Sequence, residues 1–319
     1  MVLLLKYVVT AVTGRVHQTL RIFLILLITF SLFFCVNWKS LYVKSVLFFI
    51  PQEERHYLES FFLYLNVFSG FSFVLNETKP LTTAYLKRYD MLDDLSSYSS
   101  IGHFEDFFEC LHPIILKMHK GIEIWEKYSH LFPSKNIYIS INKSRFPEPG
   151  IVIIIFNEVL LKKVINENKD DFSKILGKDF NCNLFIKKLK KKSTDFHKLL
   201  KNNDYLMGLI YGFGKDNAQA FQLRIKSNLF SIPPYLISYD FPKPPNGLTS
   251  SDLKYFWDTE NPINSFDPFF TSIPSFVINP RCLENQKLKQ KYINSYKEIN
   301  KSQRESKNIL AWSLTKLLG

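Results

Sequence analysis

The chain has 319 residues, of which 46% are hydrophobic and 16% aromatic, and it carries a formal net charge of +12. This composition excludes a disordered chain, because disordered segments lack the apolar and aromatic side chains that a folded core requires. The length allows one or two domains, and the positive charge favours contact with anionic surfaces.

An uncharged apolar stretch, Ile22 to Val36, dominates the N-terminal end of the chain. As a helix, its fifteen residues span roughly 22 Å, which is shorter than a hydrocarbon core of about 30 Å. Arg21 can extend its charge toward the lipid headgroups, and Trp38 is a residue type favoured at membrane interfaces. The stretch therefore predicts one transmembrane helix, tilted or in a locally thinned bilayer.

Two alternatives to an uncleaved anchor are a cleaved signal peptide and a buried core helix. A cleavage site needs small residues after the apolar run, whereas Asn37, Trp38 and Lys39 follow Val36. Basic residues flank the stretch evenly, so the positive-inside rule gives little orientation. A short basic N-terminus before an early span favours a single-pass protein with its C-terminal domain outside the cytoplasm. Secretion is the alternative if the stretch is cleaved.

The next segments predict an apolar stretch, one helix and one short strand. Residues 41–50 are apolar but too short to span a bilayer, which suits a position at the membrane interface or in a core, and Pro51 ends them. Glu53 to Phe68 has the spacing of an amphipathic helix. Phe71 to Leu75 predicts a short strand before a turn at Asn76 to Pro80.

The clearest helical periodicity lies between residues 104 and 125, where apolar residues recur at alternating spacings of four and three. This pattern is typical of a packing seam rather than of an aromatic ligand site, and Pro113 should kink the helix or mark the start of its second half. The seam consists of Phe104, Phe108, Leu111, Ile115, Met118, Ile122 and Trp125.

A β-hairpin is predicted by two β-branched runs, Ile137 to Ile141 and Ile151 to Phe156, joined by nine residues. The second run has no polar alternation, so that strand should be buried on both faces. The helices expected after it are Glu158 to Leu176, Leu184 to Leu200, Tyr205 to Tyr211, and a segment from Asp216 to Ile225.

The C-terminal third begins with a segment rich in proline and aromatic residues, 231–280, where nine of the fifteen prolines lie. Prolines prevent regular elements while aromatic side chains favour burial, so we expect ordered, irregular chain. Pro280 should begin a basic C-terminal helix capped by Asn279. Its apolar end, around Trp312, should pack onto the domain.

Two Glu-x-x-His pairs, Glu53 with His56 and Glu109 with His112, are the candidate metal ligands. A glutamate and a histidine three residues apart on a helix point the same way, as in four-helix di-iron carboxylate sites. However, Glu53 lies in a first helical turn, where a carboxylate is favoured by the helix dipole alone. The four widely spaced cysteines fit neither a zinc motif nor a disulfide framework. We therefore predict no cofactor, and regard a metal-dependent envelope enzyme as the alternative.

A glycine motif at Gly212, Gly214 and Lys215 suggests a phosphate-binding loop, because glycines let backbone amides approach an anion. The pattern is incomplete. A Walker loop has four residues between its first glycine and the Gly-Lys pair, and a dinucleotide fingerprint needs a third glycine where Asn217 stands. We predict a helix-terminating turn instead.

A dense lysine cluster is the main candidate contact surface, together with Trp257 in the proline-rich segment. In a membrane-tethered protein, such a cluster can hold the domain against anionic lipid headgroups or a protein partner. No base-stacking or groove-reading motif accompanies it, so nucleic acid is not an expected partner. A solvated helix face is the simpler interpretation. The lysines are Lys187, Lys188, Lys190, Lys191 and Lys192.

Several stretches together resemble an uncharacterised protein family of chlamydia-like intracellular bacteria. The resemblance implies bacterial origin, one continuous domain and an unassigned role at a cell envelope or host interface, and it brings no activity or cofactor. Asn76-Glu77-Thr78 departs from the small, glycine-containing turn expected there. The stretches are Phe71 to Pro80, Trp125 to Pro133, Val164 to Asn168 with Leu176-Gly177, Gly208 to Ala218, and Pro274 to Pro280.

The sequence thus predicts an α+β protein, mostly helical with a small β-sheet, preceded by one N-terminal transmembrane helix. Residues 1–38 form the tail and anchor, and residues 39–319 form a single globular domain. The predicted function is that of a membrane-anchored binding or interaction protein, with no reaction assigned.

Overall fold

The structure is a computed structural model that describes residues 38–87, 105–144, 150–191, 195–226, 254–255, 277–278 and 283–319. The chain divides into two units, 1–50 and 51–319. In the first unit, residues 38–49 form a helix. The predicted anchor, Ile22 to Val36, lies outside the described residues, and none of the described helices is long and apolar enough to cross a membrane.

A three-stranded antiparallel sheet lies at the centre of the second unit, with β3 (Gly150–Asn157) between β1 (Leu81–Lys87) and β2 (Ile137–Ser144). The predicted hairpin is confirmed as β2 and β3, in a register that places Ile139 opposite Ile155. Residues 153–156 of β3 are fully buried, as expected for a strand covered on both faces.

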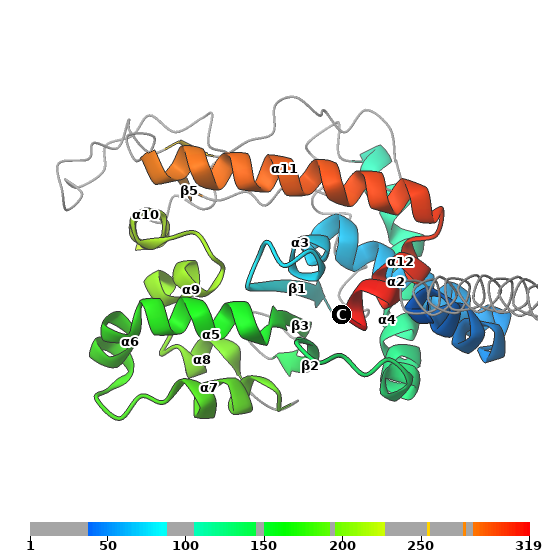
Figure 1. The fold of residues 1–319 in the computed structure, drawn as a ribbon, viewed down its shortest axis with the longest axis horizontal. Coiled ribbons are helices and arrows are strands. Elements are labelled where there is room, and N and C mark those ends of the chain that lie inside the picture. The colour runs from blue at the N-terminus through cyan, green and yellow to red at the C-terminus, as the bar shows by residue number, and fades with distance from the viewer. Residues whose placement is uncertain are drawn as a thin grey trace, which may run out of the picture. The chain divides into compact units, whose positions relative to one another are not determined.

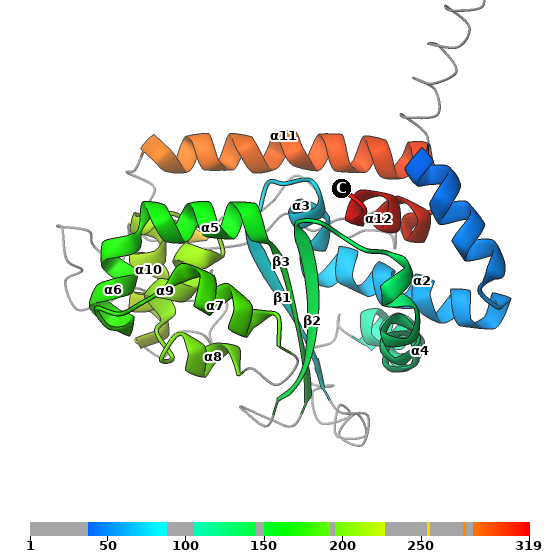
Figure 2. The ribbon, with the colours of Figure 1, turned by 60° about the horizontal axis from the view of Figure 1, so that its bottom comes forward.

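Helices cover both faces of this sheet (Figures 1 and 2). One group contains α2 (Gln52–Phe68), α3 (Phe71–Leu75), α4 (Glu105–Tyr128), the 3-10 helix η2 (Ser129–Leu131) and α12 (Ile309–Leu317). The other group contains α5 (Glu158–Glu167), α6 (Lys169–Leu176), α7 (Cys182–Leu189), α8 (Phe196–Leu199), α9 (Asp204–Ile210) and α10 (Lys215–Lys226).

The long helix α11 (Leu283–Ser306) runs past both groups in both views (Figures 1 and 2). A buried polar cluster fixes its C-terminal half against α2, α3 and α12. Gln303 donates to Asn66 Oδ1 at 3.3 Å and to Ser72 Oγ at 3.2 Å, and Asn66 donates to Ser313 Oγ at 3.0 Å. Buried polar groups are costly unless paired, so these bonds favour one arrangement of the four helices. A two-stranded ladder, β4 (Lys254–Tyr255) with β5 (Val277–Ile278), completes the described elements.

Two cores fill the spaces between sheet and helices. Between α2 and α4, the Trp125 ring lies at a centroid distance of 5.2 Å from Phe62 and 6.2 Å from Phe61. Met118 and Ile122 are also buried, which confirms the packing seam for the side chains that the structure describes. α4 continues through Pro113 as one helix. On the other face, Leu81, Ile154 and Phe156 pack with apolar residues of α5 to α10.

Four predictions about elements are wrong. The single C-terminal helix breaks at Lys307 and Asn308 into α11 and α12. Residues 71–75 form helix α3 and not a strand, and all five are buried. The segment predicted as one helix to Leu176 breaks at Asn168, whose amide Nδ2 donates to the carbonyl of Val164. The lysine-rich segment from Leu184 likewise divides into α7 and α8. The predicted Pro280 helix start and nearly all of 231–280 lie outside the described residues.

Candidate functional site

An exposed apolar face is the most unusual surface feature of the helix at 38–49. Phe48 and Phe49 are 78% and 81% exposed, and Trp38, Leu41 and Tyr42 are exposed too. Their positions recur at three- and four-residue spacings, so they form a stripe along the helix. Isolated exposed apolar residues need no explanation, but a contiguous set of large ones marks an interaction surface.

The rest of this helix explains why only one face is exposed. Val43, Leu47 and Ile50 are buried, and they share the opposite side of the helix by the same spacing. Lys44 is exposed beside the apolar stripe. The sequence predicted that 41–50 would lie at the membrane interface or in a core, and the helix has one buried and one exposed face.

The predicted lysine cluster is only partly a free charged surface. Lys190 Nζ lies 2.6 Å from Glu158 Oε2 and 3.8 Å from the Tyr138 ring centroid. Lys187, Lys188 and Lys191 are exposed. Lys192 and Trp257 lie outside the described residues. The cluster therefore combines one structural lysine with neighbours that remain accessible.

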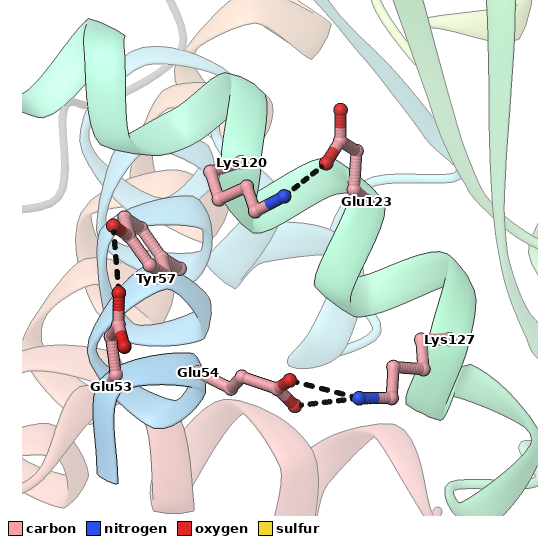
Figure 3. Close-up of polar contacts among 6 residues, drawn as sticks. All are labelled: Glu53, Glu54, Tyr57, Lys120, Glu123 and Lys127. Carbon is pink, nitrogen blue, oxygen red and sulfur yellow. Dashed lines mark hydrogen bonds and ion pairs between the residues drawn. The ribbon is translucent and has the colours of Figure 1, made fainter. Parts of the chain in front are cut away.

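The first Glu-x-x-His pair lies in the first turns of α2 and is engaged in local contacts. Glu53 accepts from the Tyr57 hydroxyl at 3.5 Å (Figure 3), while His56 Nε2 lies 3.0 Å from Lys117 Nζ and His56 Nδ1 lies 3.6 Å from Glu59. The side chains of Glu109 and His112 are outside the described part of α4. Among described residues, no group of three or more histidine, cysteine or acidic side chains could hold a metal.

An ion pair connects the same surface of α2 with α4 (Figure 3). Lys127 Nζ donates to both carboxylate oxygens of Glu54 at 2.8 and 3.0 Å. This hydrogen bond lowers the pKa of Glu54 and raises that of Lys127. Because Lys127 is exposed and Glu54 partly so, we interpret the pair as a surface contact between the two helices.

The glycine motif is the predicted helix-terminating turn. The Gly212 amide donates to the Leu209 carbonyl and the Phe213 amide to the Gly208 carbonyl, which is the Schellman pattern that ends α9. Gly212 has φ +82°, a conformation that favours glycine. Lys215 Nζ pairs with Asp171 Oδ2 at 2.8 Å, so its charge is already neutralised.

A buried lysine was not singled out by the sequence. Lys79 is 7% exposed, and its Nζ lies 3.4 Å from Thr82 Oγ1 and 5.4 Å from the Tyr211 ring centroid. Desolvation lowers its pKa to about 8. No carboxylate among the described residues forms an ion pair with it. Its burial beside Thr82 and Tyr211 fits a structural contact between the start of β1 and the turn after α9.

No protein-family model, curated protein or solved structure matches this chain. Its function must therefore be argued from its own residues and geometry.

Proposed function

We propose that this protein is a membrane-anchored interaction protein, held in the bilayer by Ile22 to Val36 and lying against the bilayer surface through the helix that follows. The observation that carries the proposal is the exposed apolar face of the helix at 38–49, which includes Phe48 and Phe49. Only Asn37 separates the uncharged stretch from this helix.

A lipid surface suits this face better than an aqueous one. Aromatic side chains favour the boundary between headgroups and acyl chains, and nearby lysines are attracted to anionic lipids. Trp38 and Tyr42 lie one turn apart, with ring centroids 6.3 Å apart, and Lys44 is exposed beside them. In this arrangement residues 51–319 are the interaction domain, placed outside the cytoplasm.

Alkaline carbonate extraction followed by protease treatment of intact cells tests the proposal on the full chain with a C-terminal tag. We expect the full-length chain in the membrane pellet, with the tagged domain cleaved only from outside. The double variant L26K/F30K should move the protein toward the supernatant, since each central lysine costs about 2.5–3.5 kcal/mol on insertion scales.

The matched variant L26A/F30A keeps the stretch uncharged and should remain in the pellet. Release of a shortened chain by carbonate would instead identify Ile22 to Val36 as a signal peptide and would contradict anchoring.

A further inference from the structure

The outer edge of β2 carries backbone groups that face away from the sheet. On the inner edge, the Glu158 amide donates to the Asn136 carbonyl at 2.7 Å, which fixes the phase of the ladder with β3. Backbone groups alternate along a strand, so even-numbered residues of β2 bond to β3. Ile139 and Ile141 therefore direct their N–H and C=O groups outward.

Two further contacts agree with this phase. The Ile137 amide points outward and donates to Ser134 Oγ at 2.9 Å. Beyond it, no other described strand pairs with the outer edge of β2. The opposite edge of the sheet differs, because on β1 the outward carbonyl of Tyr85 accepts from the Tyr64 hydroxyl at 3.0 Å. The edge of β2 thus offers the unoccupied ladder positions that an extended chain can fill.

A hollow of about 210 Å³ lies beside this edge, on the face of β2 that bears Ile139 and Ile141, and its lining is mixed, with Glu126 and Ser129 beside apolar side chains. Its wall includes Trp125 and Phe132, whose rings stack at 6.1 Å. A cavity of about 150 Å³ is large enough for a benzene molecule, so the hollow can accept an aromatic or branched aliphatic side chain.

The end of α7 lies next to the other face of β2. Tyr138 lies on this face, and the ammonium group of Lys190 lies 3.8 Å from its ring centroid and 2.6 Å from Glu158 Oε2. Lys187 and Lys191, close to Lys190 in the sequence, are exposed and form no ion pair with a described residue. The edge therefore has a partly apolar hollow on one face and the lysine-rich end of α7 beside the other.

We propose that the outer edge of β2 binds an extended segment of a partner protein as a fourth strand, with apolar and acidic residues at alternate positions. Successive side chains of a strand point to opposite faces, so one set would enter the hollow and the other would meet the lysines of α7. Backbone hydrogen bonds to Ile139 and Ile141 provide affinity, and the two faces provide specificity. The inference rests on the interaction role proposed above, but not on the anchor.

A second copy of this chain fits the edge less well. Pairing two β2 strands would bring together two copies of the α7 lysines, and like charges across a strand pair are destabilising. Charge complementarity thus favours an acidic segment.

Hydrogen exchange of the full-length chain in mild detergent tests strand addition directly. The probe is an acetylated synthetic peptide of four Val-Glu repeats. We expect it to slow exchange at the amides of Ile139 and Ile141 at least tenfold, since each would become a ladder donor. Peptides of four Val-Lys repeats, or of four valines followed by four glutamates, should leave exchange unchanged.

Two variants test separately the contributions of backbone hydrogen bonds and of lysine charge to peptide binding. I139P removes an outward N–H without removing a bond to β3, and it should abolish peptide binding. K187E/K191E should weaken binding at least tenfold, measured by fluorescence anisotropy of labelled peptide. The matched control K174E/K178E makes the same charge change at two other exposed lysines, one in α6 and one just after it. It should bind the peptide as the unmodified chain does.

Unchanged exchange of β2 with the Val-Glu peptide, or equal binding of the Val-Lys peptide, would overturn the proposal. If the amides of Ile139 and Ile141 exchange slowly without peptide, and faster when the protein is diluted, a second copy of the chain occupies the edge. That result would also overturn the proposal. If I139P fails to fold, the charge-reversal pair still decides the question. Whether the full-length chain stays in the membrane pellet during carbonate extraction does not depend on these results. Membrane anchoring and strand addition can therefore fail separately.

Discussion

At the scale of single residues, Lys79 combines a positive charge with burial, which carries an electrostatic cost. Its ammonium group is buried beside the rings of Tyr211 and Phe213, and aromatic faces compensate only part of the lost hydration. The folded chain therefore holds this proton less tightly than the unfolded chain does. The sequence could not predict this burial, because a lysine beside a proline ordinarily lies at the surface.

We predict that Lys79→Met stabilises the protein at pH 7 by about 2 kcal/mol, because it removes the cost of burying a charge. In the unmodified chain, the pKa of Lys79 falls from 10.5 when unfolded to about 8 when folded. The unfolded chain then binds more protons between these values, so the free energy of unfolding should rise with pH across that window.

Urea unfolding between about pH 7 and pH 9.5 measures this dependence below the range where tyrosines titrate. The methionine variant should show a flatter profile. Lys178→Met, at an exposed position, should leave both stability and profile unchanged. Identical pH profiles for the Lys79 variant and the unmodified chain would contradict the assignment.

At the scale of elements, the turn after α9 fits against the start of β1. A Cβ on Gly212 would lie 2.7 Å from Pro80 Cδ, whereas a Cβ on Gly214 would have no neighbour within 4 Å. Both glycines have positive φ, +82° and +79°. Substituting each glycine in turn therefore separates two costs of adding a side chain, the cost of a positive φ and the cost of a steric clash.

We predict that Gly214→Ala lowers the free energy of unfolding by about 1 kcal/mol, through the left-handed conformation alone. Gly212→Ala should cost about 2–4 kcal/mol, since it adds overpacking against Pro80. Urea or thermal unfolding followed by circular dichroism measures both. Equal losses for the two variants would show that the contact with Pro80 is not tightly packed.

The predicted helices match the structure where spacing or an end signal is clear, and they differ where a few residues decide. α2 has nearly the predicted bounds because its spacing is amphipathic, and α9 has them because a short apolar run is ended by glycine. Residues 71–75 are five apolar or small residues, a length at which strand and buried helix share one pattern. The break before α12 depends on Lys307, whose φ is +55°, and on Asn308, which caps Ala311. A lysine in that conformation has no signature in the sequence.

The candidate surfaces, like the helices and strands, could be predicted from the sequence only in part. Residues 41–50 are apolar throughout except for Lys44 and Ser45, so the sequence predicts an apolar segment but cannot tell which of its side chains are exposed. The hollow beside β2 combines Trp125, Ile139 and Leu317, which are far apart in sequence and come together only through the fold. Lys190 also belongs to the predicted lysine cluster, yet its position over Tyr138 depends on the packing of α7 against the sheet.

At the scale of the whole molecule, the proposed anchor and the helix after it contribute different kinds of membrane affinity. A spanning helix gives effectively irreversible insertion, whereas a short interfacial helix with basic residues gives reversible, salt-sensitive binding. We therefore predict that a chain of residues 38–319 binds vesicles containing phosphatidylserine reversibly. Binding should weaken as salt is raised, because the lysines contribute through screened electrostatic attraction.

In that shortened chain, F48S/F49S should lower partitioning into vesicles at least tenfold. Full burial of one phenylalanine contributes roughly 1.5–3 kcal/mol, and a tenfold change needs about 1.4 kcal/mol, so partial insertion of two rings is sufficient. The matched control V159S/L184S replaces two other exposed apolar residues, 56% and 58% exposed, and should bind normally. Vesicle co-sedimentation measures each fraction. Equal losses for the two double variants would mean that general surface hydrophobicity, and not the face of the helix at 38–49, contacts the lipid.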